Sequence, residues 1–206
     1  MIRLHLMAFL ALGAASAQAQ PMDPVQPNTD SESELRTLQK LTACLAQSRP
    51  GWARRTLSRP YLSDAQERDA AEALSGRDNC LRAGSELEVT FRTSGLVGSL
   101  ADHYLRSELP RVEFSGLRRA LSTLEPRNSS EDFALCVASR NPAAARDLAL
   151  SAPGSASEGQ IARQFAVHVP ACTLAGEKPT VDQQSLRALI STALYRATAS
   201  VLALRD

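Results

Sequence analysis

The stretch of this chain best suited to binding chemistry runs from Arg49 to Tyr61 and reads RPGWARRTLSRPY. Arginine side chains donate paired hydrogen bonds to phosphate or carboxylate oxygens, and they stack on aromatic rings. From Leu35 to Ser63 the chain has basic side chains but no acidic one. We therefore predict a surface that binds an anionic ligand. Its predicted binding residues are Arg49, Trp52, Arg55, Arg59 and Tyr61.

The segment that follows offers a different interpretation of the same residues. It reads SDAQERDAAEAL over residues 63–74 and contains four acidic side chains. If this segment folds back as a helix, its carboxylates would neutralise the arginines. Trp52, the only tryptophan, would then fill space in the core. The sequence leaves both interpretations open.

Signals for catalysis are few. The chain has no glycine-rich phosphate loop of the G-x-x-x-x-G-K type, no H-E-x-x-H and no G-x-S-x-G. Beyond the first 19 residues its only histidines are His103, beside Tyr104, and His168, in the apolar stretch FAVHVPAC. We expect both to be partly buried structural residues, and we expect no metal and no cofactor. The alternative is a small hydrolase-like enzyme that uses His103 or His168.

The cysteines are expected to form disulfides. They are Cys44, Cys80, Cys136 and Cys172. Four cysteines allow three pairings, and the equal spacing of 36 residues favours Cys44 with Cys80 and Cys136 with Cys172. A metal or redox site is disfavoured, because there is no C-x-x-C. The one histidine close to a cysteine is His168, which lies in an apolar stretch.

The first 19 residues have the pattern of a secretory signal peptide. Arg3 precedes an apolar run from Leu4 to Ala15, and the small residues Ala17 and Ala19 suit cleavage. The run is shorter than the roughly 20 residues of a membrane span, so we expect no transmembrane anchor. We therefore predict a periplasmic or secreted protein, which agrees with paired cysteines.

The overall charge argues against nucleic acid as a partner. The chain has 23 basic and 22 acidic side chains, and removal of Arg3 with the leader would balance them. A neutral chain has no general field that attracts nucleic acid, so any electrostatic binding must be local. The expected partner is an anionic component of the cell envelope or another envelope protein.

The positions of these residues follow an internal repeat with an offset of 92 residues. The offset superimposes Cys44 on Cys136, Pro50 on Pro142 and Arg54 on Arg146. Proline in a first turn and S-x-x-E/Q capping boxes at Ser63 and Ser155 mark helix starts in both copies. The expected helices span 32–48, 50–58, 64–75 and 87–107 in the first copy, and 130–140, 142–150, 156–167 and 181–204 in the second. In the segment LEVTF at 87–91, apolar and polar residues alternate, so this segment could form a strand instead of the start of a helix.

These observations predict an all-α fold of two tandem, disulfide-pinned repeats of about four helices each. The predicted organisation is a signal peptide at 1–19, a disordered segment at 20–30, repeat 1 at 31–109, a linker helix at 110–127 and repeat 2 at 128–206. A period of 92 is too long for common helical repeats of roughly 33–47 residues, so duplication of a small domain is the better explanation. We expect a non-enzymatic binding or interaction protein, which uses either the arginine and tryptophan surface or a groove between the repeats.

Overall fold

The computed structural model describes residues 25–26, 32–75, 80, 92–173 and 181–204 of the chain. Within these ranges the protein is all-α, as predicted, with a single two-residue strand pairing. The α-helices are α1 Glu32–Ser48, α2 Pro50–Ser58, α3 Asp64–Ser75, α5 Thr93–Glu108, α6 Phe114–Thr123, α7 Ser129–Arg140, α8 Pro142–Leu150, α9 Ala156–Arg163 and α10 Gln183–Ala203. Two short 3₁₀ turns are η1 Leu109–Arg111 and η2 Pro170–Cys172.

Local capping residues set most of these boundaries. Pro50 and Pro142 occupy the first turns of α2 and α8, where the missing N–H costs nothing. Ser63 accepts a hydrogen bond from the Gln66 amide, and Ser155 accepts one from the Glu158 amide. The predicted bounds of α1, α2, α3 and α8 are therefore the observed ones.

Several predicted helices differ from the observed ones at their ends. Helix α7 begins at Ser129 rather than at 130, and α6 covers Phe114–Thr123 within the predicted linker at 110–127. Helix α5 begins at Thr93, and the possible strand at 87–91 lies outside the described residues. Helix α9 ends at Arg163 rather than at 167, because the following amides bond three residues back in tight turns. Helix α10 begins at Gln183, since the Asp182 carboxylate accepts the Ser185 amide as an N-cap.

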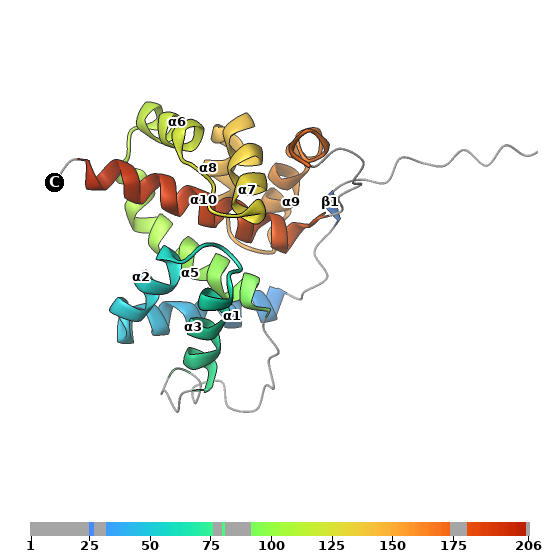
Figure 1. Ribbon diagram of the computed structural model, residues 1–206. Coiled ribbons are helices and arrows are strands. Elements are labelled where there is room, and N and C mark those ends of the chain that lie inside the picture. Colours follow the sequence, from blue (N-terminus) through green and yellow to red (C-terminus); the bar gives the residue numbers. More distant parts are fainter. Residues whose placement is uncertain (1–24, 27–31, 76–79, 81–91, 174–180, 205–206) are drawn as a thin grey trace, which may run out of the picture.

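Strands β1 Val25–Gln26 and β2 Val181–Asp182 pair in parallel, with Val25 opposite Val181. The sequence did not predict this pairing, whose first strand falls inside the segment 20–30. It places the start of the described chain beside the start of α10 (Figure 1).

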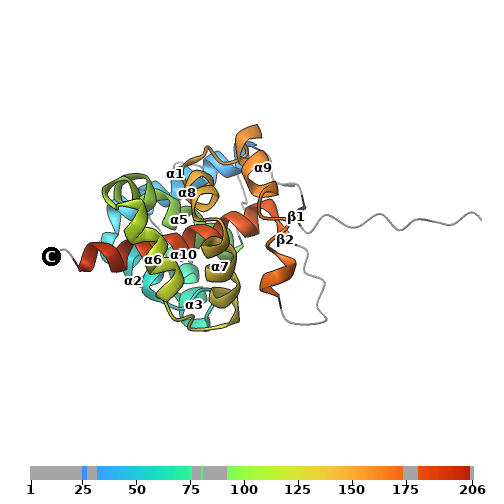
Figure 2. The same ribbon diagram turned by 90° about the horizontal axis from the view of Figure 1, so that it is seen from above.

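The long helices α5 and α10 lie side by side in the middle of the molecule. Helices α1, α2 and α3 lie on one side of this pair, and α6 to α9 lie on the other (Figures 1 and 2). One cluster of buried hydrophobic residues draws on both groups, from Leu38 and Leu57 to Leu148 and Leu194. The two halves therefore share a core.

Both predicted disulfides are present. Cys44 bonds to Cys80 and Cys136 bonds to Cys172, each with a Cα–Cα distance of 5.7 Å. The first joins α1 to the segment after α3, and the second joins α7 to η2. Each bridge thus closes the same length of chain.

Two turns that are 92 residues apart have the same local geometry. Leu62 and Gly154 both have left-handed backbone conformations, with φ of 56° and 76°. The Leu62 amide donates to Gln66 Oε1, and the Gly154 amide donates to Glu158 Oε2. Each turn leads into the next helix through its capping serine.

Candidate functional site

The two aromatic residues of the predicted anion surface lie in the core. Trp52, on α2, is 5% exposed, and its indole N–H donates to the Asp69 carbonyl at 2.9 Å. Tyr61, in the turn between α2 and α3, is 3% exposed. Neither ring can act as an exposed stacking platform. Trp52 therefore fills space in the core, which is the second of the two interpretations that the sequence left open.

The arginines of the same stretch meet the acidic helix α3. Arg59 Nε lies 3.2 Å from Asp69 Oδ2, and Arg49 Nη2 lies 4.0 Å from Glu72 Oε1. Arg55 is exposed at the end of α2. The structure therefore does not bring the five predicted residues together as one open surface, although anion binding by the arginines stays a prediction.

The two histidines lie in different parts of the molecule. His103 is half-buried on α5, with its ring edge-on to Tyr104, and burial is the main cause of its lowered pKa. His168 is half-buried in the turns between α9 and η2. Neither imidazole hydrogen-bonds a carboxylate or hydroxyl of the described residues, and these residues contain no metal-binding cluster. The hydrolase-like alternative gains no support.

A buried ion-pair network joins the first half of the chain to the second. Glu131, on α7, is 4% exposed and accepts hydrogen bonds from Arg127 and from Arg196 of α10. It also accepts the Tyr61 amide at 2.9 Å. Burial alone would raise the pKa of Glu131, but the Arg127 hydrogen bonds and the amides outweigh it, so the pKa is lowered.

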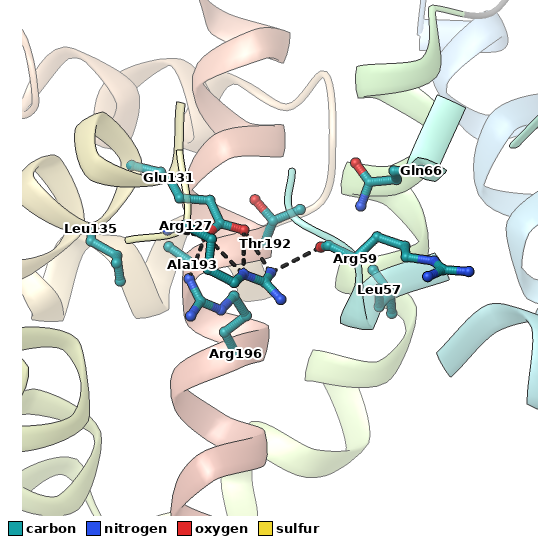
Figure 3. A pocket seen from close by; sticks show the side chains of 10 residues that line it. Leu57, Arg59, Gln66, Arg127, Glu131, Leu135, Thr192, Ala193 and Arg196 are labelled. Carbon is teal, nitrogen blue, oxygen red and sulfur yellow. Dashed lines mark hydrogen bonds and ion pairs between the residues drawn. The ribbon is translucent and has the colours of Figure 1, made fainter. Parts of the chain in front are cut away.

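This network fixes the turn that contains Tyr61. Arg127 donates to the carbonyl oxygen of Arg59 (Figure 3) and to that of Ser58. Asn128 Nδ2 donates to the Tyr61 carbonyl at 2.7 Å. The crevice beside it holds only about 10 Å³, which is barely room for one water. The Glu131 network is therefore a structural clamp rather than a ligand site.

A second clamp lies at the other turn. Arg187 of α10 is 5% exposed and bonds Asp102 of α5 at 2.7 Å and Glu158 of α9 at 3.2 Å. It also donates to the carbonyl oxygens of Ala149 and Ser151. Burial lowers the pKa of Arg187, but the two carboxylates outweigh it, so the pKa lies above its ordinary value. In both halves, an arginine thus holds the turn before a capped helix, and the arginine of this second clamp is buried.

Among the described residues, one site with room for a ligand is an open groove of about 460 Å³. Binding sites for small molecules and short segments have volumes of this order. The groove lies where the Tyr61 turn meets the first turns of α5, α7 and α10. Its described lining residues are Tyr61, Leu62, Ser94, Ser129, Ser130, Asp132, Phe133, Cys172, Thr173, Val181, Ser185 and Leu189.

Leu62 is the groove residue whose type the local backbone does not explain. Its side chain is 39% exposed, and its left-handed φ of 56° is strained for a leucine. The matching turn uses Gly154, which adopts the same conformation without strain. Strained residues of this kind concentrate at functional sites, where their conformation is held by the surroundings. Here the Leu62 conformation is held by the hydrogen bonds that the Tyr61 backbone makes with Glu131 and Asn128.

Sequence reasoning did not identify Leu62, Asp132 or Phe133. A signal was available for Leu62, because the 92-residue offset aligns it with a glycine in a turn. No such signal marked Asp132 and Phe133. They become neighbours of the Tyr61 turn only when α7 packs against it.

Comparison with protein-family models, with curated proteins and with solved structures gives no match for this chain. None of the helices in the described ranges has the length and apolar character needed to cross a membrane.

Proposed function

We propose that this protein is a non-enzymatic binding or interaction protein of the periplasm or of the extracellular space, and that it binds its partner in the groove beside Leu62. The observation that carries the proposal is an exposed, strained leucine at the edge of a groove large enough for a ligand. A leucine kept in this conformation lowers stability by about 1–2 kcal/mol, and a residue that is 39% exposed gains only part of the stabilisation of a fully buried leucine. A role in binding explains why it is there.

The two halves of the chain are, in this proposal, diverged copies of one disulfide-pinned unit. Equal disulfide spacings, the equal bounds of α2 and α8 after the 92-residue shift, and the matching turns at Leu62 and Gly154 support it. After a duplication, features that both copies share are expected to build the fold, and features found in one copy are the candidates for function. Leu62 is such a difference.

Export through a signal peptide at 1–19 is part of the same proposal. Both cysteine pairs are bonded, and disulfides persist in oxidising compartments. An envelope protein or another envelope component is then the partner class to test.

A groove-filling substitution tests the proposal. Ser130→Trp would place an indole in the groove, whereas Ser157→Trp places the same side chain on the exposed first turn of α9 as a control. Tagged parent and variant chains are used to capture partners from envelope extract, and each captured partner is then purified and titrated. We expect a partner that binds the parent and the Ser157 variant and binds the Ser130 variant at least tenfold more weakly. Equal binding to all three would exclude the groove as the site.

A further inference from the structure

Three walls of the groove beside Leu62 come from distant parts of the chain. One is the turn that carries Leu62, the second is the start of α7 with Phe133, and the third is the start of α10 with Leu189. A groove assembled in this way keeps its shape only if contacts outside it hold the walls at fixed distances. The residues that make these contacts then affect binding without touching the bound partner.

Glu131 joins all three walls, although it is not among the residues that line the groove. It lies in the first turn of α7, and its Oε1 accepts the Tyr61 amide, next to Leu62, at 2.9 Å. Its Oε2 accepts a hydrogen bond from Nη1 of Arg196 on α10 at 2.8 Å (Figure 3). A single buried carboxylate thus fixes the Leu62 turn and α10 to α7.

The charge of Glu131 holds these contacts together. Arg127 and Arg196 both pair with its carboxylate, and the Arg59 side chain, which pairs with Asp69, lines the same crevice. Burial is the main cause of the lowered pKa of Arg196, and the positive charge of Arg127 also lowers it, against the opposing effect of Glu131. Without the carboxylate charge, the two guanidinium groups would repel each other. Because Arg196 belongs to α10 and Arg127 precedes α7, the repulsion would separate these two walls.

The turn with Leu62 depends on the same carboxylate. Its left-handed backbone is disfavoured for a leucine by about five- to thirtyfold in population. The bond from the Tyr61 amide to Glu131, and the bond from Asn128 to the Tyr61 carbonyl, oppose this preference. If they weaken, the turn relaxes and Leu62 leaves the edge of the groove. The apparent affinity then falls in proportion to the fraction of molecules that keep the competent conformation.

We infer that Glu131 is a positioning residue for the groove, which sets its affinity by holding the Leu62 turn, α7 and α10 together. This role rests on the proposed function, because it concerns binding at the same groove. It is independent of the charge and the class of the partner.

Nuclear magnetic resonance of the mature chain, with both disulfides intact, tests this role without a partner. A residue with positive φ gives a strong cross-peak between its own amide and Hα protons, so Leu62 should show one in the parent. Glu131→Gln should weaken this cross-peak and shift the methyl resonances of Leu62 and Leu189. An unchanged Leu62 cross-peak in this variant would overturn the inference.

Glu158→Gln is the matched control. Glu158 is also a buried carboxylate that pairs with an arginine, Arg187, but it lies on α9, from which no described residue lines the groove. The control should leave the Leu62 cross-peak and the methyl resonances as they are in the parent. Loss of the cross-peak in both variants would show that it follows global stability, and the positioning role would be wrong.

Asn128→Ser covers the case in which Glu131→Gln does not fold. Serine keeps the N-cap of α7 but removes the amide group that donates to the Tyr61 carbonyl. We expect hydrogen exchange of the Tyr61 amide to become about two- to tenfold faster, which is the effect of one neutral hydrogen bond. The Gly154 amide of the matching turn is the internal reference and should not change. Equal exchange of the Tyr61 amide in the parent and in this variant would contradict the inference.

Binding at the groove is measured with Nile red, a neutral dye that fluoresces in apolar sites. The part of its binding that Ser130→Trp removes belongs to the groove. We expect Glu131→Gln to weaken this part about five- to thirtyfold, as the left-handed population falls, and Glu158→Gln to leave it unchanged. Equal groove binding by the parent and the Glu131 variant would overturn the inference. If Ser130→Trp removes no dye binding, the Leu62 cross-peak decides the inference, and partner capture with Ser130→Trp decides the proposed function.

Discussion

Gly98 of α5 and Ala188 of α10 are in such close contact that no side chain fits between the two helices at this point. A Cβ atom built on Gly98 would lie 2.4 Å from the Ala188 Cβ and 2.6 Å from its Cα. Atoms cannot approach so closely, so the helices must move apart if Gly98 gains a methyl group. The closest approach of the two central helices therefore depends on this glycine.

Gly98→Ala should destabilise the protein by about 1–3 kcal/mol, because overpacking outweighs the better helix propensity of alanine. Gly51→Ala is the matched control. A Cβ at Gly51 meets no atom within 4 Å, so the same change on α2 should be neutral or stabilising by up to about 1 kcal/mol. Urea unfolding with intact disulfides measures both. Equal stability of the two variants would contradict the close packing.

Glu131 should make the protein sensitive to acid. Its pKa is lowered in the folded state, so the folded protein holds its proton less tightly than the unfolded chain does. The stabilisation from this carboxylate is therefore fully present above its ordinary pKa of 4.5 and is lost as the pH falls further, through the lowered pKa. We expect Glu131→Gln to cost about 3 kcal/mol at pH 7 and to flatten the stability profile below pH 4.5.

The control for this change is Glu113→Gln, which alters an exposed acid before α6. It should leave the unfolding free energy at pH 7 within about 0.5 kcal/mol of the parent. Chemical unfolding at several pH values from 7 to 3 provides the comparison. A parallel loss of stability in the parent and the Glu131 variant would show that other groups control the acid response.

Each disulfide should contribute about 2–5 kcal/mol to stability, mainly by restricting the unfolded chain. The double variants Cys44→Ala with Cys80→Ala, and Cys136→Ala with Cys172→Ala, separate the two contributions. Because both bonds span 36 residues, the chain-entropy effect predicts similar losses. Melting of each variant, after peptide mapping of the parent without reductant, measures them. Free thiols in the exported parent would contradict the pairing.

Most helix boundaries could be predicted from the sequence because they depend on neighbours in the chain. Pro50, Pro142 and the capping serines act within one turn, so the pattern alone locates them. The end of α9 could not be placed in this way. Its apolar residues continue to Phe165 and Val169, but these side chains enter the core from turns rather than from a helix.

The candidate site could not be predicted because its residues come from distant parts of the chain. Leu62 lines the groove together with Asp132 of α7 and Leu189 of α10. The turn that carries Leu62 is held by Glu131, which is 70 residues from the Tyr61 amide. Charge composition suggested an exposed arginine surface, but the outcome depended on whether α3 folds back over α2. It does, and Asp69 then contacts both Arg59 and the Trp52 indole.

Trp52 and Arg55 allow a direct test of what this stretch does. Trp52 is buried, so Trp52→Ala should cost about 3–5 kcal/mol through the cavity it leaves and the lost hydrogen bond to Asp69. Arg55 is exposed on the same helix, so Arg55→Gln should change stability by no more than about 0.5 kcal/mol. Thermal melts of the two variants measure these effects.

Binding of vesicles with and without anionic lipid, followed for the same two variants, tests the anion surface itself. If the stretch is structural, Arg55→Gln should bind anionic vesicles like the parent does, and a folded Trp52→Phe variant should as well. If arginines of α2 bind anions, Arg55→Gln should weaken vesicle binding and reduce its dependence on salt, since exposed charges are screened. The burial of Trp52 and the pairing of Arg59 with Asp69 favour the first result.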